Sequence, residues 1–138
     1  MHDDVDLLYR NHRFTSCCAL VMAYIDALAS PGAESDRGRF SRFVKTHFAD
    51  LHDGLAGSIP GKSGGDVLYD RYRNGLLHGL GPKEGFALCT NTELNGAYSG
   101  EVEVEGIGRF VGINVDRLVQ DFLLLVQRLA AVNGRGDS

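Results

Sequence analysis

At 138 residues the chain has the length of one domain, residues 1–138, and its 43% hydrophobic and 23% charged residues match globular proteins and exclude a disordered chain. The formal net charge of −4 does not favour a protein that follows nucleic acid along a basic face, although a local basic groove is compatible with it. The three cysteines do not suggest a disulfide framework and suit a reducing cytoplasm. The N-terminal residues do not resemble a signal peptide, and no apolar run reaches the about 18 residues of a membrane span, so neither export nor a membrane span is expected.

The first half of the chain is predicted to hold three helices. Apolar residues recur at three- and four-residue spacing over residues 4–29 and again over residues 38–50, which predicts two amphipathic helices. Residues 53–65 are rich in glycine and are predicted to form a loop. Asp66 is a suitable N-cap for the third helix, because its carboxylate can accept from the free N–H groups of the first turn, and Gly79 ends this helix.

The second half changes character. Three short segments are apolar or alternate between apolar and polar residues, which predicts strands that form a hairpin: 86–89, 102–105 and 110–113. A last amphipathic helix starts at Asn114 or Asp116 and is closed by Asn133 and Gly134. The fold class is therefore predicted to be mainly α, a four-helix bundle with a small β-hairpin between the third and fourth helices.

The predicted third helix carries the segment Arg73-Asn74-Gly75-Leu76-Leu77-His78. This segment resembles the signature of the HEPN superfamily, which is an arginine, a polar residue, a short spacer and a histidine in the third helix of a four-helix bundle. The predicted order of helices agrees with that placement. The specific resemblance is limited to these six residues. Active HEPN members are metal-independent ribonucleases that usually work as dimers, with the two motifs facing each other.

The resemblance implies a role for three residues. Arg73 would hold the scissile phosphate, His78 would move a proton, and Asn74 would orient one of them. RNA carries its own nucleophile, the 2′-hydroxyl, so the protein needs only proton transfer and stabilisation of phosphate charge, with no metal and no cofactor. Imidazole, with an ordinary pKa of about 6.5, transfers protons near neutrality, and arginine grips phosphate through its planar fork.

The spacing of the motif adds a geometric constraint. Residues five apart on an ideal helix, such as Arg73 and His78, point about 140° away from each other. Asn74 and His78 are four apart and share one face. One motif alone would therefore not aim Arg73 and His78 at the same phosphate. Completion of the site by a second protomer is the better explanation, and a homodimer is predicted.

Residues near the motif are candidates for substrate binding. Arg71 and Lys83 would add positive charge beside it. Tyr69 lies on the more polar side of the helix and could stack on a base, because every base has a face that an aromatic ring can cover. Tyr72 fits the apolar face of the helix and is predicted to belong to the core.

Two functional hypotheses follow. The first is a metal-independent endoribonuclease, a toxin or defence component whose partners are RNA and an antitoxin or another protein. The second is a non-catalytic HEPN-like module that dimerises or binds a partner or a nucleotide, because arginine, asparagine and histidine at a helix end can simply interact with its carbonyl groups and neighbouring loops. The intact motif favours the first hypothesis, and the acidic total charge favours the second.

Two other patterns are weak. Residues 57–63 resemble a phosphate-binding P-loop, but the spacer is one residue short and glycines interrupt the following helix, so a flexible loop is expected. Lys62 in this loop could still reach a substrate if the loop lies near His78. His47 and His52 do not share a helical face at five-residue spacing and are predicted to be surface residues rather than metal ligands.

Overall fold

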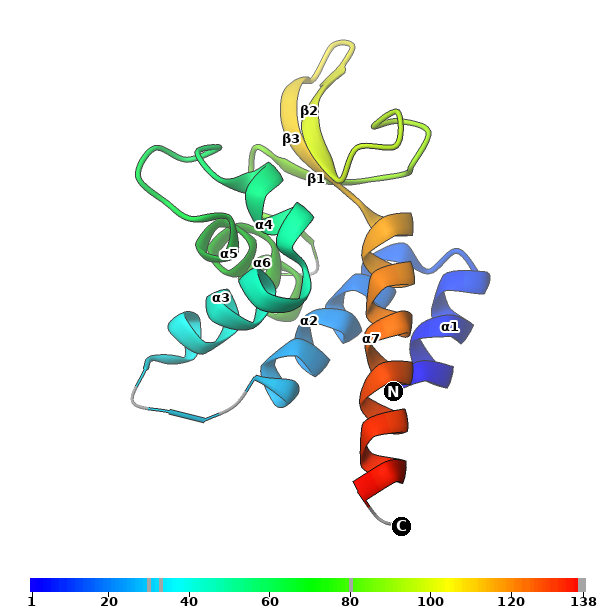
Figure 1. Cartoon of the computed structure of the whole chain (residues 1–138). Helices are drawn as coiled ribbons and strands as arrows, with labels where there is room; N and C mark the ends of the chain where they lie inside the picture. The colour runs from blue at the N-terminus through cyan, green and yellow to red at the C-terminus, as the bar shows by residue number, and fades with distance from the viewer. Residues whose placement is uncertain (30, 33, 80, 137–138) are drawn as a thin grey trace.

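The computed structural model describes the chain except for residues 30, 33, 80, 137 and 138, and it describes residues 133–136 by their backbone alone. The elements in chain order are α1 (His2–Arg10), α2 (Phe14–Leu28), α3 (Asp36–His47), α4 (Ala49–Leu55), α5 (Gly64–Val67), the π-helical segment η1 (Leu68–Arg73), α6 (Asn74–His78), β1 (Phe86–Cys89), β2 (Ser99–Val104), β3 (Gly108–Asn114) and α7 (Val115–Gly136). The three strands form a small sheet at one end of the helices (Figure 1). A mainly helical fold is therefore confirmed. Within the described residues, no helix combines the length and the apolar character needed to cross a membrane.

The N-terminal region contains two helices where one was predicted over residues 4–29. The chain turns between α1 and α2, where His12 adopts a left-handed backbone with φ of 57°. The N–H groups of His12 and Arg13 donate to the carbonyl groups of Tyr9 and Leu8, at 3.0 and 2.9 Å. A non-glycine residue rarely adopts this conformation, so the sequence carried no turn signal, and the prediction of one helix was wrong.

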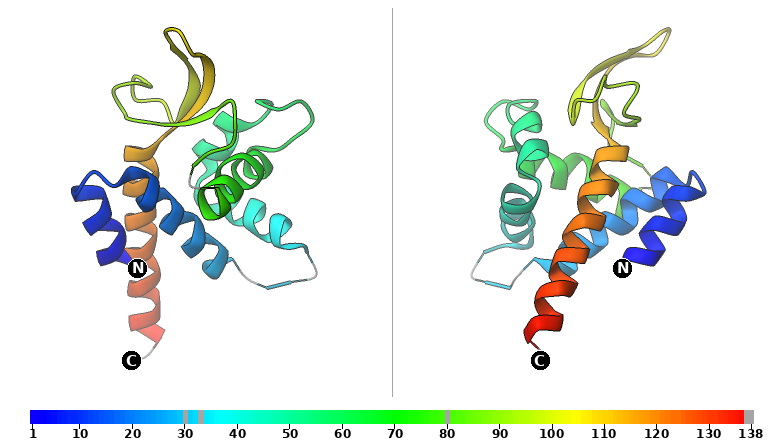
Figure 2. Two further views of the ribbon diagram at one scale, coloured as in Figure 1. Left: turned by 180° about the vertical axis from the view of Figure 1, so that it is seen from behind. Right: turned by 45° about the vertical axis from the view of Figure 1, so that its right-hand side comes forward.

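Helix α2 lies at the centre of the helical part. It contacts α1, α3, α6 and α7, and it supplies a stripe of fully buried side chains: Cys17, Cys18, Val21, Met22 and Ile25. Seen from behind, the helical stretch that includes α6 lies between α2 and α3 (Figure 2, left). The predicted apolar stripe of this helix is confirmed, and α2 becomes the surface against which the motif-bearing helix packs.

Helix α4 occupies part of the segment predicted as a loop over residues 53–65. Its side chains Leu51 and Leu55 are fully buried, so the loop starts only after residue 55. The next helix is capped by Ser63 rather than by Asp66, since the Ser63 hydroxyl accepts from the N–H of Asp66 at 3.2 Å. The predicted start of the loop was wrong because the buried Leu55 extends the helix beyond residue 53. The predicted cap was wrong because Ser63 and Asp66 are equally suitable as caps from sequence alone.

A glycine pair starts the third helical stretch because the backbone there is tightly packed. A Cβ atom on Gly64 would lie 1.7 Å from the carbonyl oxygen of His52, and one on Gly65 would lie 2.7 Å from the Cα of Ser41. The pair therefore lets α5 approach both α3 and α4 more closely than side chains would permit.

The stretch α5–η1–α6 forms the continuous third helix of the sequence prediction, over residues 64–78. Its middle part, η1, is π-helical, a feature for which the sequence has no signal. Tyr72 in η1 is fully buried, as predicted, and its hydroxyl donates to the carbonyl oxygen of Val111 on β3 at 2.6 Å. This bond joins the motif-bearing helix to the sheet.

The sheet has the strand order β1-β3-β2. Strands β2 and β3 form the predicted hairpin, with Val102 opposite Phe110, and β1 adds to β3 in parallel, with Phe86 opposite Val111. The parallel pairing was not predicted. It requires a connection that crosses from one edge of the sheet to the other, and residues 90–98 provide it.

Helix α7 starts directly after β3. The buried side chain of Asn114 caps it, since its Oδ1 accepts from the N–H of Arg117 at 3.1 Å. The Asn114 Nδ2 donates to Asn91 Oδ1 at 2.8 Å and to the carbonyl oxygen of Ala97 at 2.9 Å. The predicted start at Asn114 is confirmed. The predicted end at residues 133–134 was wrong, because α7 continues to Gly136.

Candidate functional site

The turn after α6 folds back onto the helix that carries the motif. The N–H of Gly79 donates to the carbonyl oxygen of Gly75 at 2.7 Å, and the N–H of Gly81 approaches the same oxygen at 3.3 Å. Further along, the N–H of Lys83 donates to the carbonyl oxygen of Arg71 at 2.8 Å. The turn thus satisfies carbonyl groups near the helix end that would otherwise be open to solvent.

Gly75 makes this return possible. A Cβ atom at this position would lie 2.2 Å from the carbonyl oxygen of Gly81 and 3.0 Å from the backbone nitrogen of Lys83. The turn therefore contacts the helix backbone where a side chain would otherwise project. Gly75, the spacer residue of the motif, is required for close packing rather than for flexibility.

An open depression of about 570 Å³ lies between the helix end and this turn. Its lining residues are Asn74, Gly75, His78, Gly79, Gly81, Pro82 and Lys83. The His78 and Lys83 side chains are exposed, and Asn74 is half-buried. Asn74 and His78 share this face, as their four-residue spacing predicts, and the structure adds Lys83 from the turn.

Arg73 faces a different part of the molecule. Its Nε and Nη2 donate to one carboxylate oxygen of Asp26 on α2, at 2.9 and 2.7 Å, and its Nη1 donates to Asn74 Oδ1 at 2.8 Å. The side chains of Arg73 and Asp26 are 18% and 27% exposed, so water screens this ion pair only in part. Sequence reasoning missed Asp26, which lies 47 positions before Arg73 in a mainly apolar helix.

The Arg73 side has its own small depression of about 170 Å³. Its lining residues are Asp26, Ala29, Asp36, Arg39 and Arg73, none of which lines the depression at His78. Within this chain, Arg73 and His78 therefore face separate depressions. Asn74 connects the two sides, because its Oδ1 is bonded to Arg73 while the residue also lines the His78 depression.

The other two candidate binding residues also separate. Tyr69 is half-buried and packs edge-on against Phe40, with 5.3 Å between the ring centres. The Arg73 guanidinium lies over the Tyr69 ring, 4.7 Å from its centre. Tyr69 thus belongs to the Arg73 side. The Arg71 guanidinium lies 5.8 Å from the ring centre of Phe86, and its buried Nε has no hydrogen-bond partner among the described residues. The backbone carbonyl oxygen of Arg71 accepts from the N–H of Lys83, but Arg71 is not among the residues that line the depression at His78.

The π-helical segment η1 ends at the first residue of the motif. Its hydrogen bonds span five residues, as shown by the N–H of Asn74, which donates to the carbonyl oxygen of Tyr69. Single π-helical turns are rare and occur frequently at functional sites. The local widening of the helix coincides with the place where Arg73 leaves toward Asp26.

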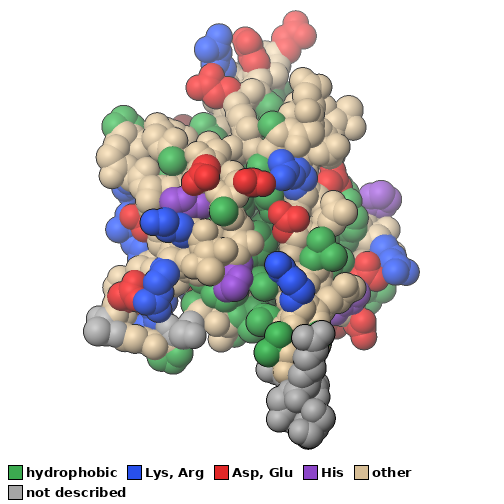
Figure 3. Space-filling view, in the orientation of Figure 1, with side chains coloured by type: hydrophobic (Ala, Val, Ile, Leu, Met, Phe, Trp, Pro, Cys, Tyr) green, Lys and Arg blue, Asp and Glu red, His purple; other side chains and the backbone are tan. Residues whose placement is uncertain are grey.

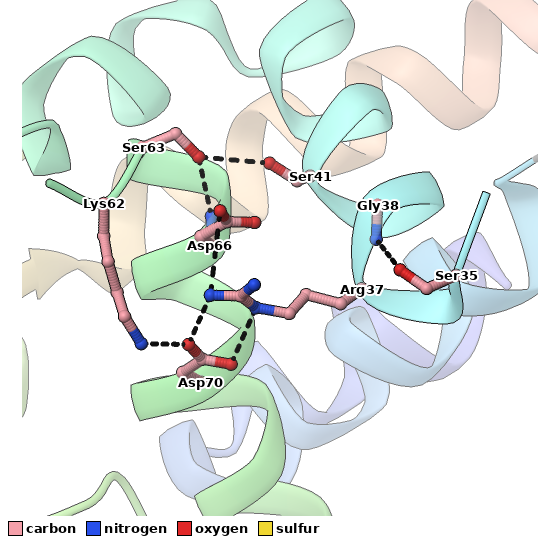
Figure 4. Close-up of polar contacts among 8 residues, drawn as sticks. All are labelled: Ser35, Arg37, Gly38, Ser41, Lys62, Ser63, Asp66 and Asp70. Atoms are coloured by element: carbon pink, nitrogen blue, oxygen red, sulfur yellow. Dashed lines mark hydrogen bonds and ion pairs between the residues drawn. The ribbon is translucent and has the colours of Figure 1, made fainter.

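Lys62 does not lie at His78. Its Nζ pairs with Asp70 on η1 at 2.6 Å, and Arg37 on α3 binds both Asp70 oxygens at 3.1 and 2.9 Å and approaches Asp66 at 3.7 Å (Figure 4). Burial acts to raise the pKa of Asp70, but the hydrogen bonds from Lys62 and Arg37 outweigh it and hold the pKa below its ordinary value. This network attaches the glycine-rich loop to the motif-bearing helix.

Another depression, of about 600 Å³, lies between α7 and the α3–α4 segment. It is lined by both apolar and charged residues: His47, Phe48, Ala49, Asp50, Asp121, Leu124, Gln127, Arg128 and Ala131. Burial and the neighbouring Arg128 lower the pKa of His47. Acidic and basic side chains are interspersed over the molecular face in Figure 3, and acidic ones gather at the hairpin. No catalytic arrangement is recognisable in this depression, so its size alone assigns it no function.

No group of three or more His, Cys, Asp or Glu side chains in the described part of the chain could hold a metal ion. The His52 Nδ1 lies 3.4 Å from the carboxylate of its neighbour Asp53, but the His52 side chain is only 13% exposed, so it is more buried than the predicted surface position. Comparisons with known protein families, curated proteins and solved structures find no match to this chain. Function therefore has to be inferred from the residues of the chain and their arrangement.

Proposed function

We propose that this chain is a HEPN-like, metal-independent endoribonuclease that acts as a homodimer in the cytoplasm, as a toxin or defence component. The observation that carries this proposal is the position of His78. Its exposed imidazole ends the helix that bears the Arg-Asn…His pattern, and it lines an open depression beside Asn74. Among the described residues it makes no hydrogen bond or ion pair, so it is available for proton transfer.

The reaction that suits this arrangement needs only proton transfer and charge stabilisation. The 2′-hydroxyl of RNA attacks the adjacent phosphorus, and the bond from phosphorus to the 5′-oxygen breaks. An imidazole accepts the 2′-hydroxyl proton, and a second, protonated imidazole donates a proton to the leaving 5′-oxygen. The products are a 2′,3′-cyclic phosphate and a free 5′-hydroxyl. Two copies of His78, one from each protomer, would supply both imidazoles.

The division between Arg73 and His78 supports the dimer. The two side chains line separate depressions within one protomer, so a second protomer is needed to bring a second motif to the same phosphate. Under this proposal, α2, α3, the stretch α5–η1–α6 and α7 would take the places of the four helices of a HEPN bundle, with the sheet inserted before the last one.

The alternative is a non-catalytic HEPN-like module that dimerises or binds a partner protein or a nucleotide. The observation that favours it is the ion pair of Arg73, whose guanidinium is already occupied by Asp26 and Asn74. An arginine held in this way stabilises the contact between α2 and the third helical stretch, and its charge is paired with Asp26 rather than offered to a substrate.

Cleavage of a mixed, structured RNA in EDTA tests the proposal. Wild type should cleave, and His78→Ala should reduce cleavage at least about 100-fold, the size typical of a general acid or base. The matched control is His2→Ala, which removes a histidine from α1. Arg73→Ala and its control Arg10→Ala, an exposed arginine of α1, show whether the arginine of the motif contributes. Circular dichroism and light scattering verify the fold and the dimer of each variant.

The outcomes separate the two hypotheses. Cleavage that resists EDTA and is lost in His78→Ala but not in His2→Ala supports the ribonuclease. No cleavage by a folded wild-type dimer, or equal cleavage by wild type and His78→Ala, rejects it and leaves the binding module. A dimer in which the two His78 side chains lie far apart would also contradict the proposed mechanism.

A further inference from the structure

We propose that a phosphate group of the RNA binds between Lys83, Asn74 and His78, and that Arg73 and Asp26 are positioning residues that fix the Asn74 amide. This inference rests on the proposed function for the identity of the ligand. It assigns the direct contact with phosphate to Lys83 in the turn after the helix, instead of to the Arg73 of the same protomer.

Arg73 is unsuited to bind the phosphate next to its own His78. Its Nε and Nη2 both donate to Asp26 Oδ2, and its Nη1 donates to Asn74 Oδ1. The carboxylate neutralises the guanidinium charge at distances of 2.7 and 2.9 Å. Release of Arg73 would leave the half-buried Asp26 carboxylate without its partner, which is costly.

Lys83 is the cation that lies beside His78. Both residues line the same depression, and the described residues of this lining include no carboxylate. Lys83 forms no ion pair with a described residue, although the adjacent Glu84 is also exposed. The bond from its N–H to the Arg71 carbonyl group holds its backbone beside the helix, so the position of Lys83 depends on the helix and not on a free loop. A lysine ammonium acts on phosphate as a compact point charge.

The bond with Arg73 determines which end of the Asn74 amide faces the depression. A guanidinium only donates hydrogen bonds, so the atom of Asn74 bonded to Arg73 Nη1 must be the carbonyl oxygen. The Nδ2 group of Asn74 is then left as a donor, and no described residue accepts from it. Asn74 lines the depression, so this donor is available to a phosphate oxygen. The bonds from Arg73 to Asp26 and to Asn74 thus orient the Asn74 NH₂ group, which the asparagine alone would not hold in one direction.

The pattern of charges also explains the ligand class. The described lining of the depression combines the cation of Lys83, the amide donor of Asn74 and the imidazole of His78. An imidazole and an ammonium beside an N–H donor suit a phosphate ester, which accepts hydrogen bonds on several oxygens and carries negative charge.

Side-chain NMR of the 138-residue chain tests the site. The probes are inorganic phosphate and an oligonucleotide with a 2′-O-methyl group on every ribose, which cannot be cleaved. In wild type, both probes should shift the signals of the His78 ring and the Asn74 NH₂ group in a saturable manner. Lys83→Met should weaken binding about tenfold or more, the size of a lost charge-assisted hydrogen bond. The matched control Lys45→Met removes an exposed cation of α3 and should leave binding unchanged.

The Arg73→Gln variant distinguishes a positioning residue from a ligand. In this variant the His78 signal should still respond to phosphate, whereas the response of the Asn74 NH₂ signal should be lost, and Arg73→Lys should restore it in part. A structural defect alone would change the melting temperature without separating these two signals. Binding that is abolished by Arg73→Gln and unaffected by Lys83→Met would overturn the inference, as would the absence of any response in wild type.

Failure of this inference and failure of the proposed function are distinguishable. If phosphate binds as described but wild type does not cleave RNA, the anion site stands and the ribonuclease is rejected. If wild type cleaves RNA and Lys83→Met cleaves it equally well, the ribonuclease stands and the assignment of Lys83 is rejected.

Discussion

The backbone N–H of Lys83 donates to the carbonyl oxygen of Arg71 at 2.8 Å and so attaches the turn after the helix to the turn before the motif. The bond brings a cation of the loop to the same side as His78, while the arginine of the motif is bound to Asp26 on the other side. The chemistry proposed for this chain depends on this separation.

Gly75→Ala should destabilise the protein, because the new Cβ would lie 2.2 Å from the carbonyl oxygen of Gly81. Alanine gains about 1 kcal/mol of helix propensity over glycine, but the clash outweighs it, and we expect a net loss of roughly 1–3 kcal/mol in the free energy of unfolding. Urea unfolding measures the change. Gly81→Ala is the matched control, since its Cβ would meet nothing within 4 Å. An equal effect of both substitutions would contradict the explanation.

Asp26 and Arg73 should be coupled energetically. Removal of either partner leaves a half-buried charge unpaired, so Asp26→Ala and Arg73→Ala should each destabilise the protein by about 1–3 kcal/mol. The double variant should be more stable than the sum of the single effects predicts, by at least about 1 kcal/mol. A double-mutant cycle from urea unfolding gives the coupling energy. Simple additivity would show that the pair contributes nothing beyond its separate residues.

Asp70 should make the free energy of unfolding depend on pH in the acid range. Its pKa is held below the ordinary value in the folded state, because the bonds from Lys62 and Arg37 outweigh burial. Such an acid contributes stability above its unfolded pKa of about 3.9, and this contribution is lost as the pH falls through the folded-state pKa. Asp70→Asn should therefore cost about 1–2 kcal/mol at pH 7, and this cost should shrink as the pH falls below about 4 and through the folded-state pKa. Urea unfolding at several pH values checks this, and a difference that stays constant down to pH 3 would exclude the network as its cause.

The three cysteines should resist thiol reagents in the folded protein. Cys17 and Cys18 are fully buried and Cys89 is 3% exposed, and burial raises the pKa of all three thiols, to about 11 for Cys17. Because the thiolate is the reactive form, a disulfide reagent at pH 8 should modify less than one thiol per chain within minutes, whereas all three should react in guanidinium. Rapid labelling of one thiol in the native state would contradict the buried position of that residue.

The regular spacing of apolar residues was enough to predict the helices that bury a continuous stripe of side chains. The core of α2, the burial of Tyr72 and the start of α7 at Asn114 follow from the spacing of apolar residues and from one capping side chain. Boundaries that depend on local backbone conformation were missed. The turn at His12 has a left-handed backbone without glycine, and Ser63 competes with Asp66 as a cap.

The candidate site was predictable only in part. Four-residue spacing placed Asn74 and His78 on one face, because helix geometry alone determines it. The contact between Arg73 and Asp26 depends on how α2 packs against the third helical stretch, and no local pattern reports it. The nearness of Lys83 depends on the return of a turn across Gly75, which only the three-dimensional structure reveals.

Strand β3 passes into α7 without a linker, and the buried Asn114 binds both the first turn of α7 and the 90–98 crossover. The hairpin and α7 are therefore joined through one buried side chain rather than through a flexible linker. Because the Tyr72 hydroxyl donates to the carbonyl oxygen of Val111 on the same strand, the hairpin, α7 and the helix that ends at His78 all meet at β3.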